Sequence, residues 1–165
     1  MPEKDTLYQT KVKHSGIFDF PELYKFCFEW FNDEGYDILE KKYSEKIKGD
    51  LKEIEVDWEC FRKVSDYFKF LIKVRFYIPN MADVEAQKNG QKVSANKGSL
   101  DVKLTAVMIK DYEKRWEGNA FLKFLRGVYD RYIIRGRIEQ YEAKIIGEIT
   151  DLIAEIKAFL SIGNK

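Results

Sequence analysis

The segment that best predicts the fold of this chain runs from Glu53 to Ile78 and reads EIEVDWECFRKVSDYFKFLIKVRFYI. Two runs in this segment alternate apolar with charged residues, and the charges are acidic in the first run and basic in the second. A period of two predicts β-strands with one buried face and one solvated face. The short interval between the runs, residues 62–66, predicts an antiparallel hairpin.

The alternation also predicts a register for this hairpin. If the turn centres on Val64, Glu59 faces Lys69 and Trp58 faces Phe70. Cross-strand pairs of opposite charge contribute roughly 0.2–1 kcal/mol each. They also oppose a slip of one residue, because such a slip would turn charged side chains into the core.

The flanking segments extend the sheet and add a helix. Residues 7–18 predict a first strand, and residues 20–34 predict a helix whose apolar residues recur at helical spacing. Asp19 stands at the N-cap position of this helix and Gly35 at its C-terminal stop. We expect the rest of the sheet within residues 36–111.

Two turn signals divide this region. Pro79 is expected to end the second strand of the hairpin, because proline cannot donate to a strand ladder. Asn89-Gly90 then predicts a type I′ turn that places Ala86 near Val93 in a polar arm projecting from the body. A further strand leads to about residue 111, which gives about six strands in all.

Helical periodicity takes over after the sheet. We predict two C-terminal helices, at residues 113–135 and 137–162, with a break near Gly136. From Asn119 onward the first carries a basic face, which contains Lys123, Arg126, Arg131 and Arg135 and is followed by Arg137, with only Asp130 opposing. Plain solvation of that face is the favoured interpretation, and an anionic partner is the alternative.

The last helix has three faces when its residues are spaced at 100°. Small residues lie opposite the apolar arc, and an acidic flank fills the space between them. A broad apolar arc suits the sheet, whereas small residues allow another helix to approach closely. The arc contains Ile145, Ile146, Ile149, Leu152, Ile153, Ile156, Phe159 and Leu160; the small strip contains Gly147, Ala154, Ala158 and Ser161; the flank contains Lys144, Glu148, Asp151 and Glu155.

Composition and charge limit the classes of function. The 165 residues are 45% hydrophobic and 35% charged, which is enough for one α+β domain, residues 1–165, with a substantial core. The 29 basic and 28 acidic residues leave a net charge of +1, which gives no overall attraction for nucleic acid or anionic membranes. We therefore do not expect nucleic acid to be a main partner.

The cellular setting is predicted from the cysteines and the apolar runs. Cys27 and Cys60 both fall on predicted buried faces, and so sparse a pair is unlike a disulfide framework. No secretory leader pattern occurs, and no apolar run approaches the roughly 20 residues of a membrane span. We expect a cytoplasmic protein without a membrane span.

Templates for catalysis and metal binding find no match in the sequence. His14 is the only histidine, which is too few for a usual zinc site and gives no Ser-His-Asp pattern. The glycines form no phosphate-binding loop. The carboxylates of residues 53–59 face a basic strand, so an ion ladder is favoured over acid–base chemistry. We predict no catalytic residue, no metal and no cofactor, and an enzyme is the least favoured class.

The predicted elements make an α+β fold with a mostly antiparallel, curved sheet and the long last helix packed on it. In element order the chain resembles the helix-grip (START-like) superfamily. That resemblance implies a sheet curled around a C-terminal helix, often with an apolar cavity. It implies no site residues, because no sequence motif is shared.

Three hypotheses of function follow. The first is a non-catalytic binding module that holds an apolar small molecule or a protein partner between the sheet and the last helix. The second is a scaffold that self-associates through the last helix, as a homodimer, and the third is weak nucleic-acid binding through residues 123–137. The candidate ligand-binding residues are Trp30, Trp58, Phe70, Phe76 and Trp116; the candidate partner-binding residues are Gly147, Ala154, Ala158, Lys123 and Arg126.

Overall fold

The computed structural model of the chain describes residues 3–65, 68–110, 120–128 and 135–163. Over these ranges the protein is α+β, with a five-stranded antiparallel sheet in the order β1-β5-β4-β3-β2. In chain order the elements are β1 (Glu3–Phe18), α1 (Phe20–Asp33), β2 (Asp37–Lys48), β3 (Leu51–Lys63), β4 (Phe68–Lys88), β5 (Gln91–Lys110), α2 (Ala120–Val128) and α3 (Arg135–Gly163).

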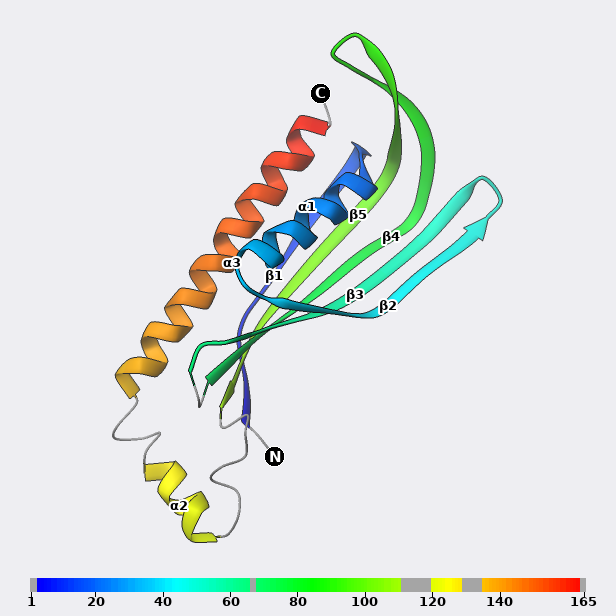
Figure 1. Cartoon of the computed structure of the whole chain (residues 1–165). Coiled ribbons are helices and arrows are strands. Elements are labelled where there is room, and N and C mark those ends of the chain that lie inside the picture. Colours follow the sequence, from blue (N-terminus) through cyan, green and yellow to red (C-terminus); the bar gives the residue numbers. More distant parts are fainter. Residues whose placement is uncertain (1–2, 66–67, 111–119, 129–134, 164–165) are drawn as a thin grey trace.

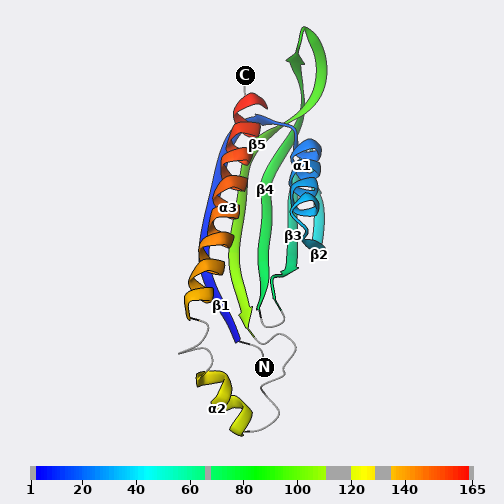
Figure 2. The same ribbon diagram turned by 60° about the vertical axis from the view of Figure 1, so that its left-hand side comes forward.

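Helices α1 and α3 cover the same face of the sheet (Figures 1 and 2). Helix α3 packs on β1 and β5, α1 packs beside β2, and the two helices contact each other. The tip of the β4–β5 hairpin extends beyond both helices (Figure 1). The prediction that the last helix packs on the sheet is confirmed, and α3 begins two residues earlier than predicted. Of the helix predicted at 113–135, the described part is α2 and the first residue of α3.

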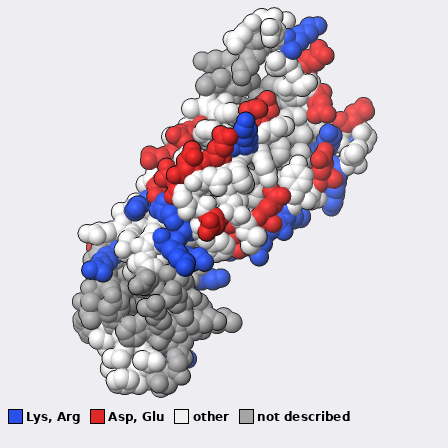
Figure 3. All heavy atoms as spheres, viewed as in Figure 1, with Lys and Arg blue, Asp and Glu red and all other residues white. Residues whose placement is uncertain are grey.

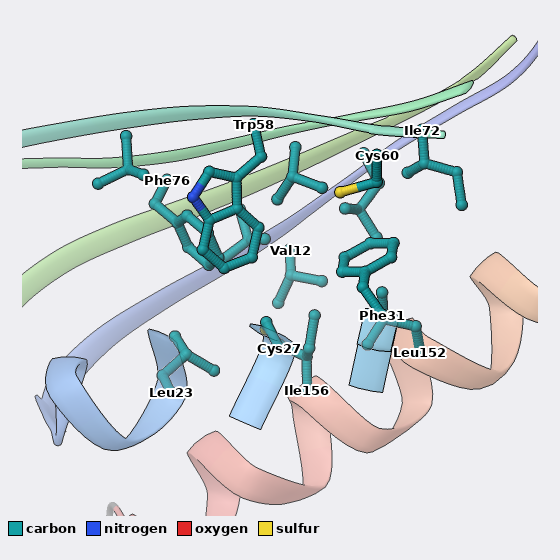
Figure 4. Close-up of a cluster of buried hydrophobic side chains, with 14 of the residues drawn as sticks. Val12, Leu23, Cys27, Phe31, Trp58, Cys60, Ile72, Phe76, Leu152 and Ile156 are labelled. Atoms are coloured by element: carbon teal, nitrogen blue, oxygen red, sulfur yellow. The ribbon is translucent and has the colours of Figure 1, made fainter. Parts of the chain in front are cut away.

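The core fills the space between the sheet and the two helices. From the sheet, Trp58 and Phe76 meet edge-to-face with ring centroids 5.1 Å apart. Phe31 of α1 and Leu152 of α3 point into the same cluster (Figure 4). The core-facing residues of α3 are at most 2% exposed, and they are Ile145, Ile149, Leu152, Ile156 and Leu160.

The prediction of about six strands is corrected to five in the described ranges. Strand β4 does not end at Pro79 but continues to Lys88, with a register shift between Tyr77 and Ala82. Proline is tolerated there because the ladder is already interrupted, so its missing N–H leaves no partner unpaired. The backbones of β4 and β5 approach closely at this shift, since a Cβ on Gly98 would lie 2.5 Å from the Asn80 carbonyl oxygen.

The predicted register of the β3–β4 hairpin was also wrong. Glu59 pairs with Lys73 rather than Lys69, a displacement of four residues. Strand β3 runs on to Lys63, so the turn lies later in the chain than a centre at Val64 allows. A displacement by an even number keeps every side chain on its predicted face.

Local signals in the sequence placed the ends of the elements. The Asp19 carboxylate caps α1 by accepting a hydrogen bond from the Glu22 N–H at 3.2 Å. Gly35 has a φ of 86°, as a C-terminal stop requires. The β4–β5 turn also has positive φ at both central residues, and Ala86 pairs with Val93 as predicted.

Candidate partner-binding groove between α1 and α3

The outward side of α3 is smooth, because its side chains are small. Gly147, Ala154 and Ala158 are all exposed, on the side of the helix opposite the core. A Cβ atom placed on Gly147 would meet nothing within 4 Å. The helix backbone of α3 is therefore open to close approach from outside the molecule.

A groove of about 320 Å³ lies beside this strip, where α3 runs next to α1. Figure 3 shows acidic side chains gathered over α3 and α1, with basic side chains gathered nearer the end where α3 begins. The groove therefore has a negative rim and one aromatic wall, and its lining is Trp30, Glu34, Glu148, Asp151, Ala154 and Glu155.

One carboxylate of the groove is already engaged inside the protein. Glu148 accepts a hydrogen bond from the Tyr36 hydroxyl at 2.7 Å and forms an ion pair with Arg62, also at 2.7 Å. Arg62 donates to the Glu34 backbone carbonyl at 2.8 Å, and its guanidinium lies 4.6 Å from the Tyr36 ring centre. Burial first, and then the hydrogen bond to Glu148, raise the pKa of Tyr36. This cluster ties α3 to β3, and Glu148 is its side chain that lines the groove.

Trp30 forms the aromatic wall. Its ring is half-buried and meets the ring of Phe31 edge-to-face, with centroids 5.0 Å apart. Nearby, Phe26 of α1 stacks on Phe159 of α3 with centroids 5.5 Å apart and an interplanar angle of 18°. Aromatic packing thus joins the two helices, and the contact with Phe31 holds the Trp30 ring in place.

The aromatic residues predicted to bind a ligand do not share one site. Trp58, Phe70 and Phe76 are buried in the core, each at most 1% exposed. Trp30 lines the groove, and Trp116 lies outside the described residues. Of the four predicted ligand-binding residues that the structure describes, three therefore belong to the core and one lines the groove.

The residues predicted to bind a partner fall into two groups. Gly147, Ala154 and Ala158 lie together on α3, as their helical spacing predicted. Lys123 and Arg126 lie on α2, beyond the start of α3 and apart from the groove (Figure 1). Lys123 is exposed, and the side chain of Arg126 lies outside the described part of the chain.

A second polar cluster anchors α1 to the sheet. The Tyr24 hydroxyl and the Trp58 indole N–H both donate to the Glu40 carboxylate, the latter at 3.0 Å. Burial, followed by the hydrogen bond to Glu40, raises the pKa of Tyr24 to about 12. The phenol therefore stays protonated, and the cluster has the character of a structural anchor rather than a reactive site.

Two further hollows on the surface are lined by residues that interact with each other. One, of about 440 Å³, lies near the start of α1, where Asn96 accepts from the Phe20 N–H at 2.9 Å and donates to Asp83 at 3.2 Å. The other, of about 310 Å³, lies on the solvated face of the sheet, where Arg75 pairs with Asp57 at 4.0 Å. In each hollow, some of the polar lining residues are thus paired within the chain.

The described residues contain no group of three or more His, Cys, Asp or Glu side chains placed to hold a metal ion. In the part of the chain that the structure describes, every helix is too short or too polar to cross a bilayer.

The sequence predicts the side of the groove that α3 provides, but not the side that α1 provides. The helical wheel put Glu148, Asp151 and Glu155 on one flank of the last helix, next to the small strip. It gave no sign that Trp30 and Glu34 would lie opposite them, because that pairing depends on how α1 and α3 cross the sheet.

Comparison of the chain with protein-family models gave no match, and neither did comparison with curated proteins. The function is therefore inferred from the chain's own residues.

Proposed function

We propose that the protein is a non-catalytic binding module that holds a basic helical segment of a protein partner against α3, in the groove between α1 and α3. The observation that carries this proposal is the groove of about 320 Å³, with carboxylates on its rim and a smooth helix beside it.

The small strip supports a helical partner. Gly147, Ala154 and Ala158 leave nothing larger than a methyl group between the α3 backbone and a second helix. Small residues at these positions allow helices to pack at separations near 8 Å, at the short end of the usual range. An extended peptide would gain little from such a surface, because the main-chain groups of α3 are already bonded within the helix.

The rim of the groove supports a basic partner. Glu34, Asp151 and Glu155 are exposed, whereas Glu148 is engaged with Arg62. A Lys or Arg side chain entering between these carboxylates would also meet the face or edge of Trp30. Cation–π contacts of this kind add roughly 0.5–1 kcal/mol at exposed sites.

The alternative ligand, an apolar small molecule between the sheet and α3, has less support. It would have to displace side chains such as Ile149 and Leu152, which are both fully buried. The resemblance to the helix-grip superfamily, with the cavity that it implies, stays a prediction, as does weak nucleic-acid binding.

The test is a titration with a labelled amphipathic Lys/Leu peptide of about 18 residues, long enough to form a stable helix on binding. Fluorescence anisotropy should show saturable binding that weakens with salt. Reversing two rim charges, Asp151→Lys with Glu155→Lys, should lower the affinity at least about tenfold. Asp50→Lys, an exposed carboxylate in the distant β2–β3 turn, is the matched control and should change little. Equal loss in both variants, or no binding to the wild-type protein, would overturn the proposal.

A second candidate function is self-association through the same strip. It is favoured by the exposure of Gly147, Ala154 and Ala158, which makes a helix of a second copy an equally good fit by shape. Sedimentation equilibrium distinguishes the two: a dimer that dissociates in Ala154→Leu supports self-association, and a monomer at all concentrations excludes it.

A further inference from the structure

Helix α2 presents two phenylalanines to solvent. Phe121 and Phe124 are each 66% exposed, more than any other described aromatic side chain. They are three residues apart, so they project from neighbouring positions on one face of the helix. Most large apolar residues of the described chain are at least half-buried, so this pair is an exception that calls for a cause.

The remaining apolar residues of α2 share one face of the helix with the pair. Leu122, Leu125 and Val128 are half-buried. At 100° per residue, the five apolar side chains cover an arc of about 160°, and Lys123 falls outside it. The helix is therefore amphipathic, and within its apolar arc the two phenylalanines are the most exposed side chains.

The sequence of α2 and of the residues that follow it is rich in basic residues. Between Ala120 and Arg137 the sequence has one acidic residue, Asp130, and the five cations Lys123, Arg126, Arg131, Arg135 and Arg137. Helix α2 lies at one end of the molecule, beyond the start of α3 (Figures 1 and 2). Helix α2, with its exposed phenylalanine pair and the exposed Lys123, thus stands at an end of the protein.

We propose that α2 docks on an anionic lipid surface, with Phe121 and Phe124 inserted among the acyl chains and Lys123 at the level of the headgroups. Amphipathic helices with Phe and Leu on one face and Lys or Arg on the other bind membrane interfaces in this way. Each cation near an anionic bilayer contributes about 1 kcal/mol at moderate salt.

A bilayer fits this surface better than other occupants. The two rings protrude from a short helix, and the mobile acyl chains of a bilayer can rearrange around protruding side chains. Proteins that stack nucleic-acid bases usually provide a charged groove that follows the strand. A protein partner would need a preformed apolar groove and a matching acidic rim.

This inference is compatible with the groove on α3. Asp151 lies 14 residues after Arg137 in the same helix, which is about 21 Å along its axis. The Debye length at physiological ionic strength is about 8 Å, so the acidic rim is screened from a lipid surface at α2. A partner helix on α3 and a bilayer at α2 can thus be bound together.

Vesicle flotation with the full chain tests the inference. Vesicles of phosphatidylcholine with phosphatidylglycerol should carry the protein upward, and pure phosphatidylcholine should carry much less. Both Phe121→Ser with Phe124→Ser and, separately, Lys123→Glu should weaken binding at least about tenfold. Ile47→Ser removes an apolar side chain that is 75% exposed at the β2–β3 hairpin, and as the matched control it should leave binding unchanged.

A second measurement keeps both phenylalanines in place. Gly127 is exposed on α2 and has nothing within 4 Å of an added Cβ, so Gly127→Cys accepts an environment-sensitive dye. The native cysteines, Cys27 and Cys60, are buried and should not be labelled in the folded protein. The dye should shift to the blue with anionic vesicles, and the same dye at Asp50→Cys should not.

Three outcomes with vesicles or RNA would overturn the inference. They are a dye that does not respond to anionic vesicles, equal binding to neutral and anionic vesicles, and retention on RNA that requires Phe121 and Phe124 while vesicles fail to bind. Concentration-dependent dimerisation that is lost in the Phe121→Ser, Phe124→Ser variant would also overturn it, because the occupant would then be a second copy of the chain.

Discussion

The two sides of α3 differ in almost every respect, although they belong to one helix. On the inner side, Ile149 and Leu152 are fully buried against the sheet. On the outer side, Gly147 and Ala154 are exposed and small. A helix needs only its inner side to fold onto a sheet. Alanine at the outer positions also suits a helix, but Gly147 lowers helix stability, so its presence is not explained by the stability of the fold. That difference is the reason for assigning the outer side to a partner.

The largest expected effect is on the inner side. Leu152→Ala should lower the free energy of unfolding by about 2–5 kcal/mol, since it removes buried methyl groups and leaves a cavity. Ala154→Leu, two residues away on the outer side, should stay within about 0.5 kcal/mol of the wild type. Urea denaturation of both variants measures the contrast, and equal losses would mean that α3 is buried on both sides.

The next effect concerns the Arg62 cluster, which joins α3 to β3. Arg62→Ala should cost about 2–3 kcal/mol, because the Glu148 carboxylate and the Tyr36 hydroxyl would stay largely buried without a cationic partner. The exposed pair Lys11–Asp101, at 3.2 Å, supplies the control. Lys11→Ala should cost less than about 1 kcal/mol. If the two substitutions cost the same, the Arg62 cluster does not fix α3 to β3.

Sequence periodicity predicted most of this fold because burial on one face leaves a clear pattern. The alternation at Glu53–Ile78 gave the faces of two strands, and the 100° spacing from Ile145 to Leu160 gave the inner side of α3. Register escaped prediction because a displacement of four residues preserves that pattern. The strand count failed at Pro79, where a bulge accommodated a residue that usually ends a strand. Only the α3 side of the groove could be predicted from the sequence, because no local signal pairs Trp30 with α3.

Alkaline pH tests the core beneath the inner side. Burial raises the pKa of the Cys27 thiol from an ordinary value near 9.0 to about 12, and burial also raises that of Cys60. A raised pKa means that the folded state holds the proton more tightly. Its contribution to stability is complete below pH 9 and is lost as the pH rises towards 12. Between pH 9 and 10 the loss from Cys27 should be about 1 kcal/mol.

Denaturation curves at several pH values measure this loss, with Cys27→Ala as the control that should show a flatter profile. Rapid reaction of either thiol with an alkylating reagent in the native protein at pH 8 would contradict the account, because a buried neutral thiol is a poor nucleophile.

The smallest expected effect is a gain. Gly147→Ala should stabilise the protein by about 0.5–1 kcal/mol, since alanine is the better helix former and its methyl group meets nothing within 4 Å. Thermal denaturation measures the gain. A loss of stability would show that the outer side of α3 is already covered within the molecule.

The most direct test of the partner groove is a correlation spectrum of amide nitrogens and protons, recorded while the basic helical peptide is added. The account predicts that the Trp30 indole signal and the Gly147 amide signal shift together and saturate. Gly49 and Gly90, which lie in the two hairpin turns, should not move. Peptide binding that moves the hairpin glycines while Trp30 and Gly147 stay in place would contradict it.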